Sequence, residues 1–350
     1  MTYINVKGRD RFLYRAVDST GQTIDFLLTD RRDAAAGQAK FIGTLLWDRR
    51  LIAMEPAAAL AQPECLCNTT RESDEEICYK GLLTGVAVIE RLLEVRNLAI
   101  SYRARSGGPH RALTEVNLEI APGRVLGLVG GSGSGKTTLA LAILGLLPSN
   151  AHIDSGGIFF RGIDLLGAGD HALQRIRGAQ ISIIFQEPAT ALNPVLRVGE
   201  QIADVIAAHT ACSRGQCREI AKERMRELQL CDVQTMYDAY PHELSGGQRQ
   251  RIAIAQAFAC RPALVVADEP TTALDSITQA GILRLIKHLV TTTGVAMILI
   301  THDPALLQNL ADRMAVLDAG TLVEEGAFRD VCERPVHPYT ASLLAECRKC

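Results

Sequence analysis

The chain has 350 residues, 47% of them hydrophobic, and carries a formal net charge of −2. This length and composition allow a sizeable core and more than one domain, which excludes disorder throughout. The near-neutral charge gives no bulk electrostatic reason for nucleic-acid binding. No apolar run reaches the roughly 18 residues that span a bilayer, and the N-terminus lacks the apolar region of a secretory signal. The ten cysteines have no repeated metal-ligand spacing and are expected to be free thiols.

The first 40 residues are predicted to form three antiparallel strands. Thr2, Ile4 and Val6 alternate with polar residues, and apolar-rich strands are expected at Phe12–Val17 and Thr23–Leu28. Turns are expected at 8–10 and 18–21. Three strands bury little surface by themselves.

This N-terminal stretch, from Tyr3 to Ala36, resembles the start of the integrase-like catalytic core of bacterial DDE-type insertion-sequence transposases. In that family the first catalytic Asp immediately precedes the Thr-Tyr-Ile segment, and this chain begins after it. Asp18, Asp25 and Asp30 are interpreted as turn and surface residues, whereas two-metal chemistry needs converging carboxylates. We therefore expect a partial, catalytically inactive β-meander. Residues 41–91 match no pattern and are expected to be a poorly ordered junction.

From about Leu92 the pattern is regular α/β, and its first motif is a glycine-rich loop. Val125–Val129 is a strand-like apolar run, Gly130–Gly135 follows, and a helix is predicted from Lys136. Glycines let backbone N–H groups converge on phosphate, and the helix N-terminus favours the same anion. The strand and helix on either side favour a phosphate loop over a plain turn. Lys136 is expected to reach the β- and γ-phosphates. The residues predicted to bind nucleotide here are Gly130, Ser132, Gly133, Gly135, Lys136, Thr137 and Thr138, with the Thr137 hydroxyl also a Mg²⁺ ligand.

Polar groups follow three further apolar runs. Asp268 and Glu269 end the run that begins at Leu264, Gln186 follows Ile181–Phe185, and His302 follows Met297–Thr301. Because parallel strands present their carboxyl ends at one edge of a sheet, these groups are expected to meet. Asp268 is predicted to hold Mg²⁺ through water, and Glu269 is predicted to act as general base. Gln186 is expected to contact Mg²⁺ or the attacking water, and His302 is expected to form a hydrogen bond with the γ-phosphate. Taken singly, an Asp-Glu strand end in solvent or a structural histidine would be the ordinary interpretation.

Two other segments complete the predicted site. Tyr102, upstream of the glycine loop, is expected to stack on adenine, with a partly buried strand tyrosine as the alternative. Leu244–Gln248 precedes a stretch of helical periodicity, so Ser245, Gly246, Gly247 and Gln248 are predicted to form a second anion site at a helix N-terminus.

These motifs, in this order, resemble the ATP-binding subunits of ABC transporters, from about Leu92 to the C-terminus. In that family the glycine loop is Walker A, Asp268-Glu269 closes Walker B, Leu244–Gln248 is the signature, and Ala273–Asp275 is the D-loop that contributes Asp275. The resemblance implies a P-loop ATPase core with an antiparallel β subdomain and a helical subdomain. It also implies a nucleotide held between Walker A of one subunit and the signature of another, so that Ser245 and Gln248 act in trans. The expected domains are an ATP-binding domain over 92–335, with its helical part over about 187–243, and a truncated C-terminal extension over 336–350.

Finer matches at Phe185–Pro194, Tyr240–Gly247, Ala267–Asp275 and His337–Thr340 resemble the oligopeptide and dipeptide importer branch. That resemblance implies ATP and Mg²⁺ as cofactors and the cytoplasmic face of the bacterial inner membrane as the location. It implies three kinds of partner: a second ATPase subunit, identical or not, two membrane permeases, and a periplasmic or lipid-anchored solute-binding protein. No nucleic acid is expected. The alternatives are a non-functional remnant of a transposon insertion and a soluble ABC-type ATPase with no role in transport. A DNA-binding transposase is the least favoured, because the acidic residues and the basic charge are missing.

Overall fold

The computed structural model describes residues 2–6, 9–17, 23–28, 91–103, 108–272 and 274–347. The predicted N-terminal meander is confirmed as β1 (Thr2–Val6), β2 (Arg9–Val17) and β3 (Thr23–Leu28), joined antiparallel in that order. The first predicted turn was too long. Val6 pairs with Arg9, and Asn5 pairs with Asp10. Arg9 and Asp10 therefore belong to β2 and to its ladder of hydrogen bonds. The predicted junction over 41–91 lies, apart from its last residue, outside the described residues.

The remaining strands form two sheets. The central sheet contains β6 (Val125–Val129), β9 (Ile181–Ile184), β10 (Leu264–Asp268), β11 (Ala296–Thr301), β12 (Arg313–Asp318) and β13 (Thr321–Ala327). The second sheet is antiparallel and contains β4 (Leu93–Tyr102), β5 (His110–Ile120), β7 (Ala151–Phe160) and β8 (Ile163–Asp164). The α-helices are α1 (Lys136–Ile143), α2 (Asp170–Ile176), α3 (Pro188–Ala191), α4 (Val198–His209), α5 (Arg214–Glu227), α6 (Val233–Asp238), α7 (Gly246–Phe258), α8 (Ser276–Thr293), α9 (Phe328–Glu333) and α10 (Pro338–Cys347). Short 3-10 helices lie at η2 (Pro241–Glu243) and η3 (Pro304–Leu307).

The central sheet has the order β13-β12-β6-β11-β10-β9, and every neighbouring pair is parallel except β12 with β13. Strands β6, β9, β10 and β11 are buried along their whole length. A parallel sheet covered on both faces requires continuous apolar strands of this kind. Their carboxyl ends lie at one edge, where β6 continues into the glycine loop and β10 into Glu269. The predicted α/β core is thus confirmed.

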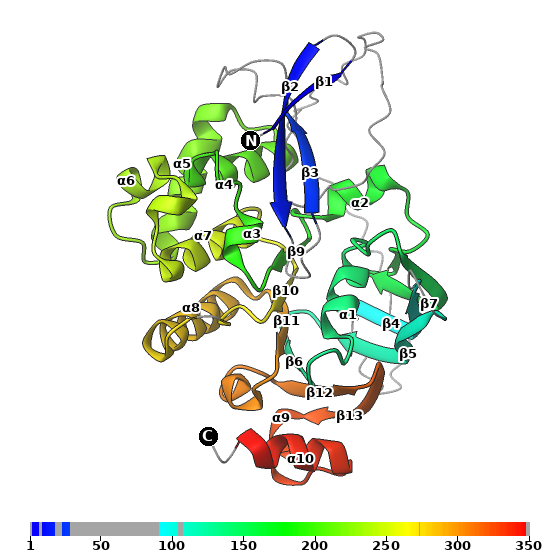
Figure 1. The fold of residues 1–350 in the computed structure, drawn as a ribbon. Coiled ribbons are helices and arrows are strands. Elements are labelled where there is room, and N and C mark those ends of the chain that lie inside the picture. Colours follow the sequence, from blue (N-terminus) through cyan, green and yellow to red (C-terminus); the bar gives the residue numbers. More distant parts are fainter. Residues whose placement is uncertain are drawn as a thin grey trace, which may run out of the picture. The chain divides into compact units, whose positions relative to one another are not determined.

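The two faces of the central sheet bury different clusters. Along each inner strand, successive side chains alternate between them: Val265 and Ala267 face one cluster, Leu264 and Val266 the other. Helices α7 and α8 lie on the first face, with α4 and α5 packed against α7, and α1 with the antiparallel sheet covers the second (Figure 1). The sheet edge therefore lies between a helical layer and the β subdomain.

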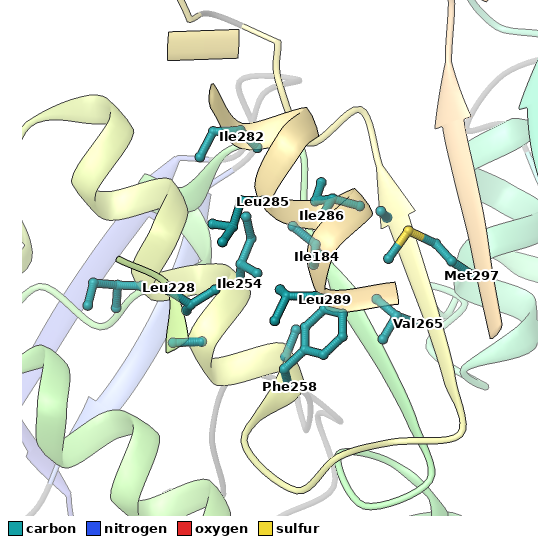
Figure 2. Close-up of a cluster of buried hydrophobic side chains, with 14 of the residues drawn as sticks. Ile184, Leu228, Ile254, Phe258, Val265, Ile282, Leu285, Ile286, Leu289 and Met297 are labelled. Atoms are coloured by element: carbon teal, nitrogen blue, oxygen red, sulfur yellow. The ribbon is translucent and has the colours of Figure 1, made fainter. Parts of the chain in front are cut away.

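Helices α7 and α8 pack on the first face through narrow apolar stripes. On α8 the buried positions are Ile282, Leu285, Ile286 and Leu289, a spacing that places them on one side of a helix. Figure 2 shows these side chains meeting Ile254 and Phe258 of α7 and Val265 of the sheet. This packing fixes the start of each helix relative to the sheet edge.

Between Gln186 and Asp238 the chain forms helices α3 to α6, within the expected helical part. Helix α5 begins at Arg214, where Ser213 and Gln216 form a capping box. Glu200 of α4 ties this layer together. Its carboxylate accepts hydrogen bonds from Arg218 of α5 and from the Tyr237 hydroxyl of α6 at 3.2 Å. In the described part of the chain, no helix is both long and apolar enough to cross a membrane.

Candidate functional site

The glycine loop runs from β6 into α1, as the motif predicted. Two of its glycines are required by close backbone approaches. A Cβ at Gly130 would lie 2.1 Å from the Leu317 carbonyl oxygen, and one at Gly135, where φ is +104°, would lie 2.6 Å from that of Ala112. No other residue type fits either position without moving the backbone. The loop is thus a shaped cradle that opens at the N-terminus of α1.

Lys136 is the cation of this loop and is buried, with 7% of its surface exposed. Its ammonium donates hydrogen bonds to the carbonyl oxygens of Gly130 at 2.9 Å and Gly131 at 2.7 Å. Burial lowers the pKa of Lys136, and the carboxylates of Glu269 and Asp268 oppose that shift. A desolvated ammonium at the N-terminus of a helix is a site for an anion with several oxygens, such as a polyphosphate.

The strand-end residues converge on Glu269. Its carboxylate accepts a hydrogen bond from Gln186 Nε2 at 3.1 Å, and its other oxygen lies 3.2 Å from His302 Nδ1. Gln186, Glu269 and His302 follow three adjacent parallel strands, β9, β10 and β11, which explains why residues so distant in sequence meet. The prediction that these side chains share one edge is confirmed.

The backbone at Glu269 takes an uncommon conformation, with φ at +44°. A non-glycine residue in this region costs on the order of 1–3 kcal/mol and persists only where its surroundings enforce it. Here the Glu269 N–H donates to the Ile300 carbonyl at 3.0 Å, and the Thr272 hydroxyl donates to its carboxylate at 2.8 Å. Thr272 was not predicted. Its hydroxyl binds Oε2 of the carboxylate, the same oxygen that accepts from Gln186.

Asp268 and Thr137 lie side by side beneath the loop. Burial raises the pKa of Asp268, and a hydrogen bond from the Thr137 hydroxyl opposes the shift. A buried carboxylate and a hydroxyl are hard oxygen donors, and a cation would relieve the cost of keeping this carboxylate charged. Among the described residues no group of three or more His, Cys, Asp or Glu could hold a metal. The donors present, Asp268 and Thr137, fit Mg²⁺, which uses one or two protein carboxylates and completes its shell with phosphate and water.

Tyr102 ends β4 and approaches the start of α1. Its hydroxyl lies 3.2 Å from the Thr138 hydroxyl, and the side chain is half-buried. Tyr102 therefore lies beside the helix that begins at Lys136. Stacking on adenine stays a prediction.

Ser245 and Gln248 form a capping box at the start of α7. The Gln248 N–H donates to Ser245 Oγ at 3.3 Å, and the Ser245 N–H donates to Gln248 Oε1 at 2.8 Å. The spacing Ser-x-x-Gln is the sequence signal for this arrangement. A Cβ at Gly247 would lie 2.7 Å from the Thr278 methyl group of α8, so this glycine allows close helix packing. Ser245, Gly246, Gly247 and Gln248 thus lie together at one helix start.

Asp275 caps the neighbouring helix α8. One of its carboxylate oxygens accepts from the N–H groups of Ile277 and Thr278 at 3.1 and 3.0 Å. Hydrogen bonds from Thr278 lower the pKa of Asp275. Leu274 beside it lies 3.7 Å from a Cβ built on Gly246, which connects this segment to the start of α7. A nucleotide contact by Asp275 stays a prediction.

The structure describes six of the ten cysteines. None of the six that the structure describes takes part in a disulfide; they are Cys212, Cys217, Cys231, Cys260, Cys332 and Cys347. Cys350 lies outside the described residues.

Two family models match this chain, in separate segments. Residues 113–272 match the model described as ABC transporter. This range contains the glycine loop, Gln186, the signature and Glu269. Residues 1–52 match a model described as a DDE domain, in agreement with the resemblance of the N-terminal meander.

Curated relatives cover most of the same region. The probable D,D-dipeptide transport ATP-binding protein DdpD of Escherichia coli (strain K12) is 44% identical over 254 residues, which are 72% of this chain and 77% of that protein. The oligopeptide transport ATP-binding protein OppD of Bacillus subtilis (strain 168) is 42% identical over 258 residues, or 73% of this chain and 72% of that protein.

A solved structure of an ATP-binding cassette is similar to this chain in fold. The dimeric ATP-binding cassette MJ0796, in a post-hydrolysis state with ADP and Pi bound, has a TM-score of 0.61 and 31% identity. The match covers 68% of this chain and 99% of that one. With the glycine loop, the strand-end cluster around Glu269 and these relatives together, the chain belongs to the ABC transporter family of ATP-hydrolysing subunits.

Proposed function

We propose that this chain is the ATP-hydrolysing subunit of an importer that energises uptake of peptides or a related small solute across the bacterial inner membrane. The observation that carries the proposal is the cluster of Gln186, Glu269 and His302 at the sheet edge that also bears the phosphate loop. The peptide class is supported by the two relatives that transport dipeptides and oligopeptides. The ATP-binding domain would cover residues 92–335, with its helical part over about 187–243.

The residues take distinct roles in this proposal. The loop N–H groups and Lys136 bind the phosphates. Thr137, Asp268 and Gln186 would hold Mg²⁺, which would supply positive charge beside the phosphates. Glu269 takes a proton from the attacking water. Its hydrogen bonds to Gln186 and Thr272 aim the carboxylate, and His302 lies where it can donate to the γ-phosphate.

The signature acts on a nucleotide held by a second subunit. Ser245 and the N–H groups of Gly246 and Gly247 stand at the start of α7, where the helix dipole favours an anion. ATP bound to Walker A of one subunit would add charge-assisted contacts to the signature of the other and so favour a closed dimer. Loss of the γ-phosphate would let the dimer reopen. This cycle would drive two membrane permeases, which receive the solute from a solute-binding protein. Helices α4 to α6 would contact the permeases on the cytoplasmic side.

Complementation between two defective chains tests the shared site. Lys136→Ala damages only the phosphate loop, and Ser245→Arg fills only the signature, so each variant alone is expected to hydrolyse little ATP. In a two-fold dimer, their equimolar mixture restores one complete site in half of the molecules, giving about a quarter of wild-type activity. Phosphate release from the mixture and from each separate variant is the measurement. A mixture no more active than its components would remove the homodimeric form of the proposal and leave a non-identical partner ATPase.

Uptake in the cells that carry this chain tests the transport role. Replacement of the chain by its Glu269→Gln variant is expected to abolish uptake of labelled dipeptides and oligopeptides, with uptake of a labelled free amino acid as control. Unchanged peptide uptake together with ATP hydrolysis by the purified chain would favour a soluble ATPase. Absence of both would favour a transposon-derived remnant.

A further inference from the structure

The C-terminal helix α10 reaches back to the phosphate loop through one tyrosine. The hydroxyl oxygen of Tyr339 accepts a hydrogen bond from the Gly131 N–H at 2.8 Å, across 208 positions of sequence. A Cβ built on Gly131 would lie 3.0 Å from the same oxygen. The phenol is therefore in direct contact with the loop backbone. It belongs to the His337–Thr340 motif, for which neither the sequence nor the proposed function gives a role.

The start of α10 is held in place by Glu324 of β13. Its carboxylate accepts hydrogen bonds from the N–H groups of Val336 and His337, both at 2.9 Å. Further along the helix Leu344 is buried in the core cluster that covers one face of the central sheet, and Tyr339 packs against the same cluster. The phenol is thus attached to the rigid part of the domain and is not carried on a loose tail.

Both backbone polar groups of Gly131 form hydrogen bonds. Tyr339 binds its N–H, and the Lys136 ammonium binds its carbonyl oxygen at 2.7 Å. A glycine offers no side chain to restrict its own backbone, so its conformation depends on these bonds and on one from the Ser134 N–H to the Gly131 carbonyl at 3.3 Å. When Lys136 turns to the phosphates of a bound nucleotide, Tyr339 still holds the Gly131 N–H.

We propose that Tyr339 is a positioning residue that pre-orders the phosphate loop and makes α10 part of the nucleotide site. This inference rests on the proposed assignment of Gly130–Thr137 as the phosphate cradle. A loop that is already ordered loses less conformational entropy on binding, so the nucleotide binds more tightly. One neutral hydrogen bond corresponds to a change of roughly 2- to 12-fold in an equilibrium constant.

Tyr339→Phe tests this role, because it removes the hydroxyl and keeps the ring. The Kd values of ATP and ADP are each expected to rise by about 3- to 10-fold, since the loop serves phosphates common to both. The kcat at saturating ATP is expected to stay within about two-fold of wild type, because the contacts of Glu269 are untouched. Ser342→Ala, at an exposed position on the same helix, is the matched control and should change neither quantity.

Hydrogen exchange separates ordering of the loop from a general loss of stability. Peptides that span residues 125–137 should exchange faster in Tyr339→Phe than in wild type or Ser342→Ala, while peptides from α8 stay unchanged. If the wild-type chain binds nucleotide and Tyr339→Phe leaves both Kd values and this exchange unchanged, the inference is overturned by itself. Tighter binding, or weaker binding of ATP alone, would also overturn it. A wild-type chain that binds neither nucleotide would overturn the proposed function and this inference with it.

Discussion

Glu269→Gln is expected to lower the rate of ATP hydrolysis by at least about 10²-fold while ATP still binds, because general-base catalysis contributes on the order of 10²–10⁴-fold. The amide has the size of the carboxylate and keeps an oxygen that can accept from Gln186 or Thr272. It lacks the negative charge and cannot take the proton of the attacking water. Loss of that charge beside Lys136 should, if anything, favour the binding of the polyphosphate.

Three measurements check this prediction. Steady-state phosphate release should fall, the Kd of ATP from isothermal titration calorimetry should stay close to wild type, and the ATP-bound variant should elute as a dimer in gel filtration. The matched control is Glu325→Gln, which removes a carboxylate paired with Arg313 on β12, away from the site. Full hydrolysis by the Glu269 variant would exclude this residue as the general base and transfer the role to another group at the sheet edge.

The catalytic edge was predictable from sequence because its strands are buried on both faces. Burial forces β6, β9, β10 and β11 to be short, uninterrupted apolar runs. A polar residue directly after such a run must then lie at the carboxyl edge of the sheet. The order of residues alone therefore indicates that Gln186, Glu269 and His302 lie together.

Contacts between distant segments had no comparable signal. Nothing near Gly131 or near Tyr339 indicates that they touch, because the contact depends on how α10 docks on the core through Leu344 and Glu324. The capping boxes at Ser213 and Ser245 are a different case. Their Ser-x-x-Gln spacing is a local signal. A serine at this position can cap a helix or bind a ligand, and the structure shows that both serines cap helices.

Lys136→Ala is expected to reduce ATP hydrolysis by at least about 10²-fold, the usual cost of removing one preorganised electrostatic contact. It should also weaken ATP binding, in contrast with Glu269→Gln. The ammonium is buried, so its interaction with phosphate is little screened by solvent. The variant also leaves the carbonyl oxygens of Gly130 and Gly131 without their shared donor, which loosens the loop.

Loss of binding must be distinguished from loss of folding. Thermal unfolding of Lys136→Ala should therefore be recorded beside its ATPase rate and its Kd for ATP. Lys287→Ala, at an exposed position on α8, removes the same side chain far from the loop and should keep wild-type values in all three. Lys136→Arg retains the charge, but its planar guanidinium does not fit a position defined by two converging carbonyls, so it should not restore activity. Hydrolysis at the wild-type rate by Lys136→Ala would refute the phosphate role of the loop, since no other cation in the described site approaches Gly130 and Gly131.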